Sequence, residues 1–394
     1  MKSLSLLISG LLFFALAACA TSSKSHEVAP DPTTTKIFVT VAPQQTDPAV
    51  TDEKVTKIQD MLTDRAVHTA TLLPNGNVLI AGGFNSRGVP LSSAEIYDPT
   101  LNRFLPTGSM NSPRQSHTAI LLPNGKVFIA GGYGNDNEYL GSAELYDPLT
   151  EKFVLTARMI IPRAGHIATL LKNGQVLLAG GVGTGWTFLD SAELFDPKQN
   201  TFTLTGNMTT ARESHAATLL KDGKVLIIGG HRGRQSSIII YSSAELFDPD
   251  TGSFTATSDM VTKRHKHDAV LLEDGRVLVV GGADERDDRG EYSTAEIYDP
   301  HVGTFKIIGN MNTTRYKFQG TSILLGTGKV LLIGGASLTE VYDPVANTFR
   351  KVIDGLGTTR LFATATLLQD GRVVMAGGYG TNISASANAW IFQP

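Results

Sequence analysis

The stretch LLPNGNVLIAGG (residues 72–83) decides the fold, because variants of it recur six more times along the 394-residue chain. Each copy has two apolar runs joined by a two-residue turn and ends in Gly-Gly. Six of the seven turns are Asn-Gly or Asp-Gly, which accept the positive φ values of a type I′ turn. The pattern predicts one β-hairpin per copy. The Gly-Gly pairs begin at Gly82, Gly131, Gly180, Gly229, Gly281, Gly334 and Gly377.

Two further strands are predicted after each hairpin. A loop leads to a segment such as SAEIYDP (residues 93–99), and a segment such as FLPTGSM (residues 104–110) follows. The nearly continuous apolar runs of the hairpins indicate strands that are covered on both faces. One four-stranded sheet cannot cover both of its own faces, whereas sheets stacked around an axis cover one another. The sequence therefore predicts an all-β fold, a seven-bladed β-propeller.

The two ends of the repeat array predict how the ring closes. The last repeat ends in AWIFQP (residues 389–394), which matches the AEIYDP strand, and it has no fourth strand of its own. Upstream of the first repeat, KVTKIQDM (residues 54–61) has the spacing of a fourth strand followed by its final Met. We therefore expect an N-terminal strand to complete the last blade, so that the propeller spans residues 54–394.

The repeat resembles the kelch-repeat β-propeller family over about residues 54–394. The Gly-Gly pair, the Tyr-Asp-Pro segment and the aromatic residue after it all stand at kelch spacing. The chain departs from the family in the fourth strand, where kelch repeats usually carry Trp. This difference changes the volume of the core more than the fold. The residues at that position here are Phe104, Phe153, Phe202, Phe254, Phe305 and Phe349.

The N-terminus predicts export and lipid attachment. A short apolar run follows Lys2 and ends in LAAC, which closes on Cys19, the single cysteine. These features are typical of a signal peptide, residues 1–18, and the ending resembles the bacterial lipobox, in which the cysteine is acylated. Residues 19–53 are rich in Ser, Thr and Pro, as in a flexible tether. We expect a protein anchored by lipid in the bacterial cell envelope, with the outer membrane favoured over the inner because Ala20 follows the cysteine.

Three polar residue types recur from blade to blade. A residue repeated in every blade is expected to serve what all blades share, so we interpret the Arg, His and Glu residues as scaffold. Equivalent positions around a channel lie too far apart for several His to hold one ion, and no metal site is predicted. The arginines are Arg65, Arg114, Arg163, Arg212, Arg264, Arg315 and Arg360. The histidines are His68, His117, His166, His215 and His267. The strand-three glutamates are Glu95, Glu144, Glu193, Glu245, Glu296 and Glu340.

We predict buried Arg–Glu pairs around the ring, because an unpaired charge between packed blades would be costly. Blade seven has Trp390 in the position of the glutamate. One arginine is therefore expected to lack its repeat partner, and the alignment does not identify which.

Enzymes that resemble this repeat provide a test of function. Galactose-oxidase-like proteins need a Tyr cross-linked to Cys beside copper, and here the only cysteine is the proposed anchor Cys19. Kelch-type sialic-acid epimerases use charged side chains without a metal, but no acid/base pair stands out from the repeat. A net charge of −3 without a basic block excludes a nucleic-acid partner. We therefore expect a monomeric binding or scaffolding module without a cofactor. A carbohydrate-active isomerase, epimerase or lyase is the alternative.

Ligand binding is expected where the blades differ, because loops carry specificity. The loops between strands two and three lie on the face opposite the tight turns. They are long in blades four (residues 231–243) and five (283–294) and short in blade six (336–338). RYKFQG (315–320) of blade six also inserts two residues, so that either Phe318 or Gly320 takes the histidine position. We expect a notch there that binds an envelope protein or a glycan. The acidic residues of loop five lack calcium-loop spacing. The candidate residues are Tyr133, Trp186, His231, Arg232, Arg234, Tyr241, Arg286, Arg289, Tyr292, Tyr316, Lys317 and Phe318.

Overall fold

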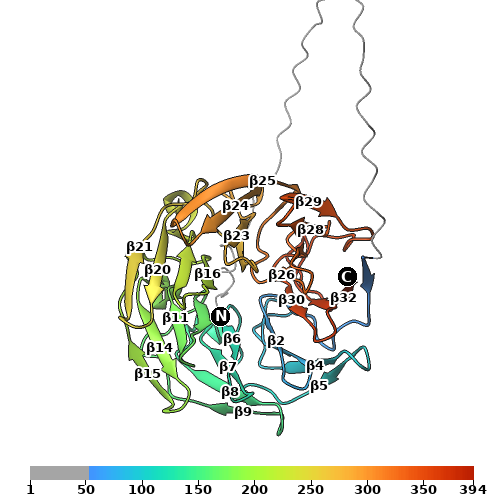
Figure 1. The fold of residues 1–394 in the computed structure, drawn as a ribbon. Helices are drawn as coiled ribbons and strands as arrows, with labels where there is room; N and C mark the ends of the chain where they lie inside the picture. Colours follow the sequence, from blue (N-terminus) through green and yellow to red (C-terminus); the bar gives the residue numbers. More distant parts are fainter. Residues whose placement is uncertain (1–52) are drawn as a thin grey trace, which may run out of the picture. The chain divides into compact units, whose positions relative to one another are not determined.

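The computed structural model describes residues 53–394, which form seven four-stranded antiparallel sheets arranged around an axis (Figure 1). The predicted signal peptide, Cys19 and the tether up to residue 52 lie outside the described residues. The first strand of each blade lies nearest the centre and the fourth lies on the rim, as β2, β6 and β9, β15 show in Figure 1. The predicted all-β propeller of seven blades is confirmed.

Each blade contributes four strands in the predicted order. Blade one contains β2 (Thr69–Leu72), β3 (Val78–Ala81), β4 (Ala94–Asp98) and β5 (Arg103–Pro106). Blade two contains β6 (Thr118–Leu121), β7 (Val127–Ala130), β8 (Ala143–Asp147) and β9 (Lys152–Leu155). Blade three contains β10 (Ile167–Leu170), β11 (Val176–Ala179), β14 (Ala192–Asp196) and β15 (Thr201–Leu204). Blade four contains β16 (Ala216–Leu219), β17 (Val225–Ile228), β20 (Ala244–Asp248) and β21 (Ser253–Ala256). Blade five contains β22 (Asp268–Leu271), β23 (Val277–Val280), β24 (Tyr292–Asp299) and β25 (Thr304–Arg315). Blade six contains β26 (Ser322–Leu324), β27 (Val330–Leu332), β28 (Glu340–Asp343) and β29 (Thr348–Lys351).

Blade seven joins the two ends of the propeller. It contains β30 (Thr364–Leu367), β31 (Val373–Ala376) and β32 (Ala389–Gln393), with β1 (Lys54–Lys57) as its outer strand. The antiparallel register of β1 and β32 runs from Lys54 opposite Gln393 to Lys57 opposite Trp390. The predicted closure by an N-terminal strand is confirmed.

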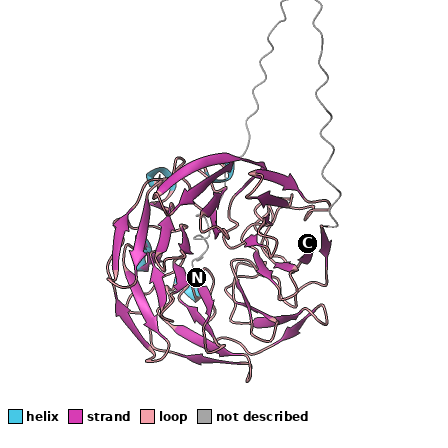
Figure 2. Cartoon of the chain, viewed as in Figure 1, coloured by secondary structure: helices cyan, strands magenta, loops and turns pink. Residues whose placement is uncertain are grey.

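Within residues 53–394, the short ribbons and 3₁₀ turns lie in the loops between second and third strands. The third and fourth loops form the two-stranded ribbons β12 (Val182–Gly183) with β13 (Thr187–Phe188) and β18 (His231–Arg232) with β19 (Ile239–Ile240). Single 3₁₀ turns, cyan in Figure 2, are η1 (Asn135–Asn137), η2 (Thr184–Trp186), η3 (Gln235–Ser237) and η4 (Asp287–Arg289). Within residues 53–394 no helix has the length and apolar character needed to cross a bilayer.

The core lies between neighbouring blades, as the apolar pattern predicts. All four residues of β7 and of β11 are buried. Phe128 on β7 stacks on Phe195 of the next blade with ring centroids 4.2 Å apart. The fourth-strand Phe of a blade packs on the strand-three aromatic, as Tyr97 and Phe104 do at 5.0 Å. The Phe residues thus fill the positions that Trp usually takes in kelch repeats.

The predicted Arg–Glu pairs are confirmed in six blades. In blade three the Arg163 guanidinium lies 2.9 Å from the Glu193 carboxylate, and both side chains are fully buried. Arg163 also donates to the carbonyls of Gly180 and Ser191. The Glu193 carboxylate accepts the backbone N–H groups of the connection that enters the blade. The corresponding pairs of the other blades are Arg65–Glu95, Arg114–Glu144, Arg212–Glu245, Arg264–Glu296 and Arg315–Glu340.

The arginine without a glutamate is Arg360, the residue that the alignment left open. It is half-buried and donates to Asn388 Oδ1 at 2.8 Å. Its guanidinium lies 5.4 Å from the centroid of the Trp390 ring.

The repeated histidines also belong to the scaffold, as predicted. His117 Nε2 lies 3.0 Å from Thr69 Oγ1 of the preceding blade, and His166 makes the same contact with Thr118. Burial, and then the neighbouring Arg114, lower the pKa of His117 to about 3. These rings are therefore neutral, and those of His68, His117 and His166 join adjacent blades through a threonine hydroxyl.

The Gly-Gly pairs let the backbone of one blade approach the next. At Gly131, φ is +64°, and a Cβ would lie 2.4 Å from the Arg163 carbonyl oxygen. At the turn residue Gly174, φ is +87° and a Cβ would meet nothing within 4 Å. We expect Gly131→Ala to lower the free energy of unfolding by about 2–3 kcal/mol and Gly174→Ala by about 1 kcal/mol. Urea denaturation of both variants checks this difference, and equal losses would contradict it.

Candidate functional site

The centre of the loop face is built by the two residues between each scaffold arginine and the histidine position. The second residue of each pair has positive φ, between 50° and 61°. Its N–H donates to the carbonyl of the equivalent residue in the preceding blade at six of the seven junctions, for example Lys317 to Lys266 at 3.0 Å. The seven residues of this ring are Val67, Ser116, Gly165, Ser214, Lys266, Lys317 and Phe362. The ring brings side chains from all blades to one place at the axis.

Charged and hydrogen-bonding residues occupy these positions in blades four to six. The loops of blades four and five add three more charged or ionisable side chains through close contacts. We call this group the central cluster, and it consists of Glu213, His231, Arg234, His265, Lys266, Asp287, Tyr316 and Lys317.

Asp287 is the acceptor at one end of the central cluster. Its carboxylate lies 2.7 Å from Lys266 Nζ, 3.7 Å from Lys317 Nζ and 3.7 Å from His265 Nε2. Burial opposes ionisation, but Lys266 and Lys317 outweigh it and hold the pKa of Asp287 below its usual range. Asp287 is therefore an ionised acceptor that draws together residues of blades five and six.

Glu213 occupies the other end of the central cluster. Its side chain is 15% exposed and lies 3.5 Å from Arg234 and 3.9 Å from His231. Burial raises its pKa, although Arg234 and Lys266 act in the opposite direction. The His231 and His265 rings meet edge to face at 4.9 Å, so the two ends are in contact. Burial and the nearby Lys266 lower the pKa of His231 to about 3 and that of His265 to about 2, which keeps both rings neutral.

Lys317 is the most strongly perturbed cation of the central cluster. Burial, and then Lys266, lower its pKa to about 8, while Asp287 partly offsets them. Its Nζ lies 3.4 Å from the Tyr316 hydroxyl and 4.7 Å from the centre of the Tyr316 ring. Burial, and then Asp287, raise the pKa of Tyr316, so its hydroxyl remains protonated. Perturbed groups of this kind occur often at functional sites.

An aromatic platform stands beside the central cluster. It consists of Tyr133, Tyr139 and Trp186, with ring centroids 4.8 to 5.9 Å apart. Trp186 is 48% exposed. The Arg234 guanidinium lies over the Trp186 ring, 3.5 Å from its centroid, and also pairs with Glu213. Arg234 therefore connects the platform with Glu213. The arrangement offers an exposed ring face next to a cation.

The structure brings six of the predicted candidates to this region. His231, Arg234, Tyr316 and Lys317 belong to the central cluster, and Tyr133 and Trp186 belong to the platform. The other loop candidates lie farther out. Arg286 pairs with Asp284 of its own loop at 2.5 Å, and Arg232 and Arg289 are exposed in loops four and five.

Tyr241 and Tyr292 are placed mainly by the scaffold. Their rings lie 5.4 Å from the Arg212 guanidinium and 5.5 Å from that of Arg264, respectively. Both stand four residues before the strand-three glutamate, where blades one to three carry Leu. The tyrosines therefore cover the buried arginines of their own blades.

The prediction that Phe318 lies at the loop face is wrong, because this residue lies in the core. It takes the histidine position of blade six, 1% exposed, and its ring stands where a Cβ on Gly281 would meet it at 2.8 Å. The two inserted residues follow it as a turn, and Asp268 accepts the N–H groups of Gly320 and Thr321 at 3.0 and 3.1 Å. The alternative that Gly320 takes the histidine position is thereby removed.

Sequence interpretation missed four members of the central cluster: Glu213, His265, Lys266 and Asp287. The signal was present, since the two residues between Arg and His are AV, QS, AG, ES, HK, YK and LF in successive blades. Variable residues inside a constant motif indicate positions that the scaffold leaves free. Only the ring of positive φ angles shows that these positions meet at the axis.

Within residues 53–394 no group of three or more His, Cys, Asp or Glu side chains is arranged to hold a metal ion. In the central cluster, the lysines and Arg234 take the places next to the carboxylates.

Comparisons with known proteins agree with this architecture. Among solved structures, a fungal alcohol oxidase of the AA5 family in complex with copper superposes with a TM-score of 0.68 at 17% identity, covering 88% of this chain and 76% of that chain. At this identity the likeness shows the fold alone. No curated protein matches the sequence. The model of the KLHDC2/KLHL20/DRC7 Kelch-repeats domain matches residues 67–282, more than half of the chain. The chain therefore belongs to the kelch-repeat family.

Proposed function

We propose that this propeller is a binding module that holds an acidic glycan at the centre of its loop face, over blades three to six. The observation that carries the proposal is the contact between the central cluster and the aromatic platform through Arg234. Kelch propellers are a fold suited to binding and scaffolding. The sequence-predicted lipid anchor would place the module in the bacterial cell envelope.

The chemistry of the surface supports an acidic sugar. Arg234, Lys266 and Lys317 supply three cations, against the carboxylates of Asp287 and Glu213. The three cations outnumber the two carboxylates, so the net charge of these five side chains is positive. The exposed face of Trp186 suits the carbon face of a sugar ring, and cation–π contacts from Arg strengthen such sites.

A carbohydrate-active enzyme, such as an isomerase, epimerase or lyase, is the second candidate. The lowered pKa of Lys317, beside the protonated Tyr316 hydroxyl, favours it because proton transfer needs groups that titrate near neutral pH. Binding is preferred because Asp287 and Glu213 are occupied by ion pairs with residues of the same cluster.

A glycan array probed with the labelled full chain tests the proposal. We expect retention on acidic glycans such as uronic-acid or sialic-acid oligosaccharides. Trp186→Ala should weaken binding at least tenfold, because stacking on this ring is lost. Asp287→Asn should weaken it similarly, because Lys266 and Lys317 lose the carboxylate that positions them.

Two control variants lie outside the loop face. Leu149→Ala removes an exposed apolar side chain (92% exposed), and Lys126→Ala removes an exposed cation paired with Asp147. Both should bind like the wild type. Retention of a protein from solubilised envelope, but of no glycan, would replace the glycan with a protein partner. Conversion of a retained sugar would favour the enzyme, and equal binding by Trp186→Ala and wild type would overturn the site.

A further inference from the structure

Blade seven differs from the other six at the position of the scaffold carboxylate. In blade two this position is Glu144, which accepts hydrogen bonds from Arg114 at 2.8 Å and from the backbone N–H groups of Asn111 and Ser112 at 2.8 and 3.3 Å. The two amides stand three and two residues before the arginine. The amide three residues before the arginine donates to the glutamate carboxylate in all six blades that have the glutamate, and the amide two residues before it also donates in blades two, three and five.

The donors of this arrangement persist in blade seven without the acceptor. Trp390 stands opposite Met375 and Lys57, as Glu144 stands opposite Ile129 and Leu155. The corresponding donors are the Arg360 guanidinium and the amides of Gly357 and Thr358. Within residues 53–394 neither of these two amides donates a hydrogen bond.

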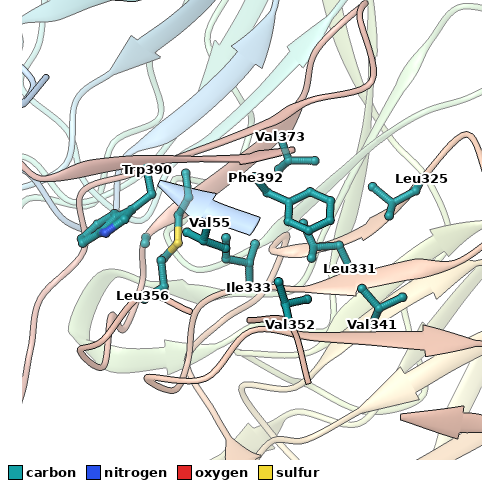
Figure 3. Packing of buried hydrophobic residues seen from close by; sticks show 12 residues of the cluster. Val55, Leu325, Leu331, Ile333, Val341, Val352, Leu356, Val373, Trp390 and Phe392 are labelled. Atoms are coloured by element: carbon teal, nitrogen blue, oxygen red, sulfur yellow. The ribbon is translucent and has the colours of Figure 1, made fainter. Parts of the chain in front are cut away.

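A cavity of about 460 Å³ opens at this place. Its lining includes Arg360, Gly357 and Thr358 together with Val55, Leu356 and Trp390. Figure 3 shows Trp390 at one end of the buried cluster between blades six and seven, with Leu356 and Val55 near it. The cavity therefore combines cationic and amide donors with an apolar surface.

The other charged groups around the cavity do not replace the missing carboxylate. Lys57 and Asp354 line it as well and are exposed. A further acid, Asp60, is 47% exposed, lies 3.4 Å from Lys57 and acts on Arg360 electrostatically. Asn388 lies between them, because its amide nitrogen donates to Asp60 at 3.1 Å and its Oδ1 accepts from Arg360 at 2.8 Å. Arg360 has no ion pair within 4.0 Å among residues 53–394, unlike each of the six other scaffold arginines.

We propose that the blade-seven cavity binds the carboxylate group of an external ligand in the place that a glutamate side chain fills in the other six blades. Arg360 would pair with the carboxylate, the two amides would donate to it, and the short aliphatic part would pack on Val55 and Leu356. Either a small organic acid or the side chain of an acidic peptide carries this group. The site lies between blades six and seven and does not depend on the proposed glycan site.

Propionate, which reproduces the glutamate side chain beyond Cα, is the first probe. The chain has two tryptophans, so the indole N–H signals in NMR report on both places at once. Titrating the full chain with propionate should shift the Trp390 signal to saturation and leave the Trp186 signal unchanged. Arg360→Met should reduce the affinity at least tenfold. The absence of a saturable shift in the wild type, or equal shifts with chloride, would overturn the proposal.

A matched pair of variants supplies an independent test by calorimetry. Trp390→Ala opens the cavity and should bind propionate at least as tightly as the wild type. Trp390→Glu supplies the carboxylate from the chain itself and should bind none. Equal binding by the two folded variants would overturn the proposal. Comparison of propionate with an acetylated Gly-Glu-Gly amide separates the sources, because tighter binding of the peptide indicates an acidic peptide and binding of propionate alone indicates a small acid.

Discussion

Lowering the pH from 7 to 5 is expected to unfold the propeller, because its repeated histidines are buried as neutral rings. Burial, and then the scaffold arginines, lower the pKa of His117 and His215 to about 3. The same causes hold the pKa values of His68, His166 and His267 well below the usual 6.5. The unfolded chain therefore takes up these protons first, and stability that is fully present above about pH 7 is lost as the pH falls through 6.5 toward 3.

The size of the effect follows from linkage. At pH 5.5 each such histidine costs about 1.4 kcal/mol, so five cost about 7 kcal/mol together. Folded domains are stable by only about 5–15 kcal/mol. His231 and His265 act in the same direction, whereas the raised pKa values of Glu213 and Asp268 act in the opposite one, because there the native state takes up the proton first. The contributions of the two histidines and of the two carboxyl groups to the change of stability with pH therefore have opposite signs.

Urea denaturation between pH 5.5 and 7.5 measures the slope. His117→Gln should reduce the slope of unfolding free energy against pH by about 0.7 kcal/mol per pH unit on average over this range, because one histidine fewer takes up a proton on unfolding. His301→Gln changes an exposed residue in the turn after β24 and should leave the slope unchanged. A wild-type stability that stays constant down to pH 5.5 would contradict the neutral, buried state of these rings.

Arg163→Met is expected to lower the free energy of unfolding by about 3–5 kcal/mol, because it leaves the buried Glu193 carboxylate without its cation. The carbonyls of Gly180 and Ser191 also lose a donor. Arg360→Met is the matched comparison within the same repeat. It should cost about 1 kcal/mol, because Arg360 is only half-buried and holds no carboxylate.

A second change tests whether the unpaired charge is the cause. Adding Glu193→Leu to Arg163→Met should recover at least about 1 kcal/mol, because the isolated carboxylate is removed. Thermal and urea denaturation of the two single variants and the double variant give these differences. Equal losses for Arg163→Met and Arg360→Met would show that the ion pair is not what stabilises the blade.

The architecture could be predicted from the sequence because the same repeat occurs seven times. The Asn-Gly turns, the apolar runs and the Gly-Gly pairs are local signals, and each copy supports the others. The closure by β1 and the existence of one arginine without a glutamate follow from the same alignment, since a missing strand and a missing glutamate are visible as gaps in a regular pattern. The alignment could not identify Arg360 as the lone residue, because the pairing partner depends on which connection packs against which strand.

The candidate site could be predicted only in part. Loops four and five stand out in length, and loop four supplied His231 and Arg234. Asp287 lies in loop five too, but its role depends on the approach of Lys266 and Lys317 from two different blades. No local pattern records such a convergence.

The sequence by itself determined the fold class, the number of blades, the closure and the scaffold pairs of this protein, because each depends on short-range periodicity. Only the tertiary structure decided which side chains meet. Lys266 and Lys317 are 51 residues apart in number, yet their backbones are joined by a hydrogen bond at the axis. Trp390 on β32 and Gly357 in the connection between blades six and seven line the same cavity. These contacts arise because each blade is rotated about the axis relative to the blade before it, which brings equivalent positions of neighbouring blades together whatever their distance along the chain.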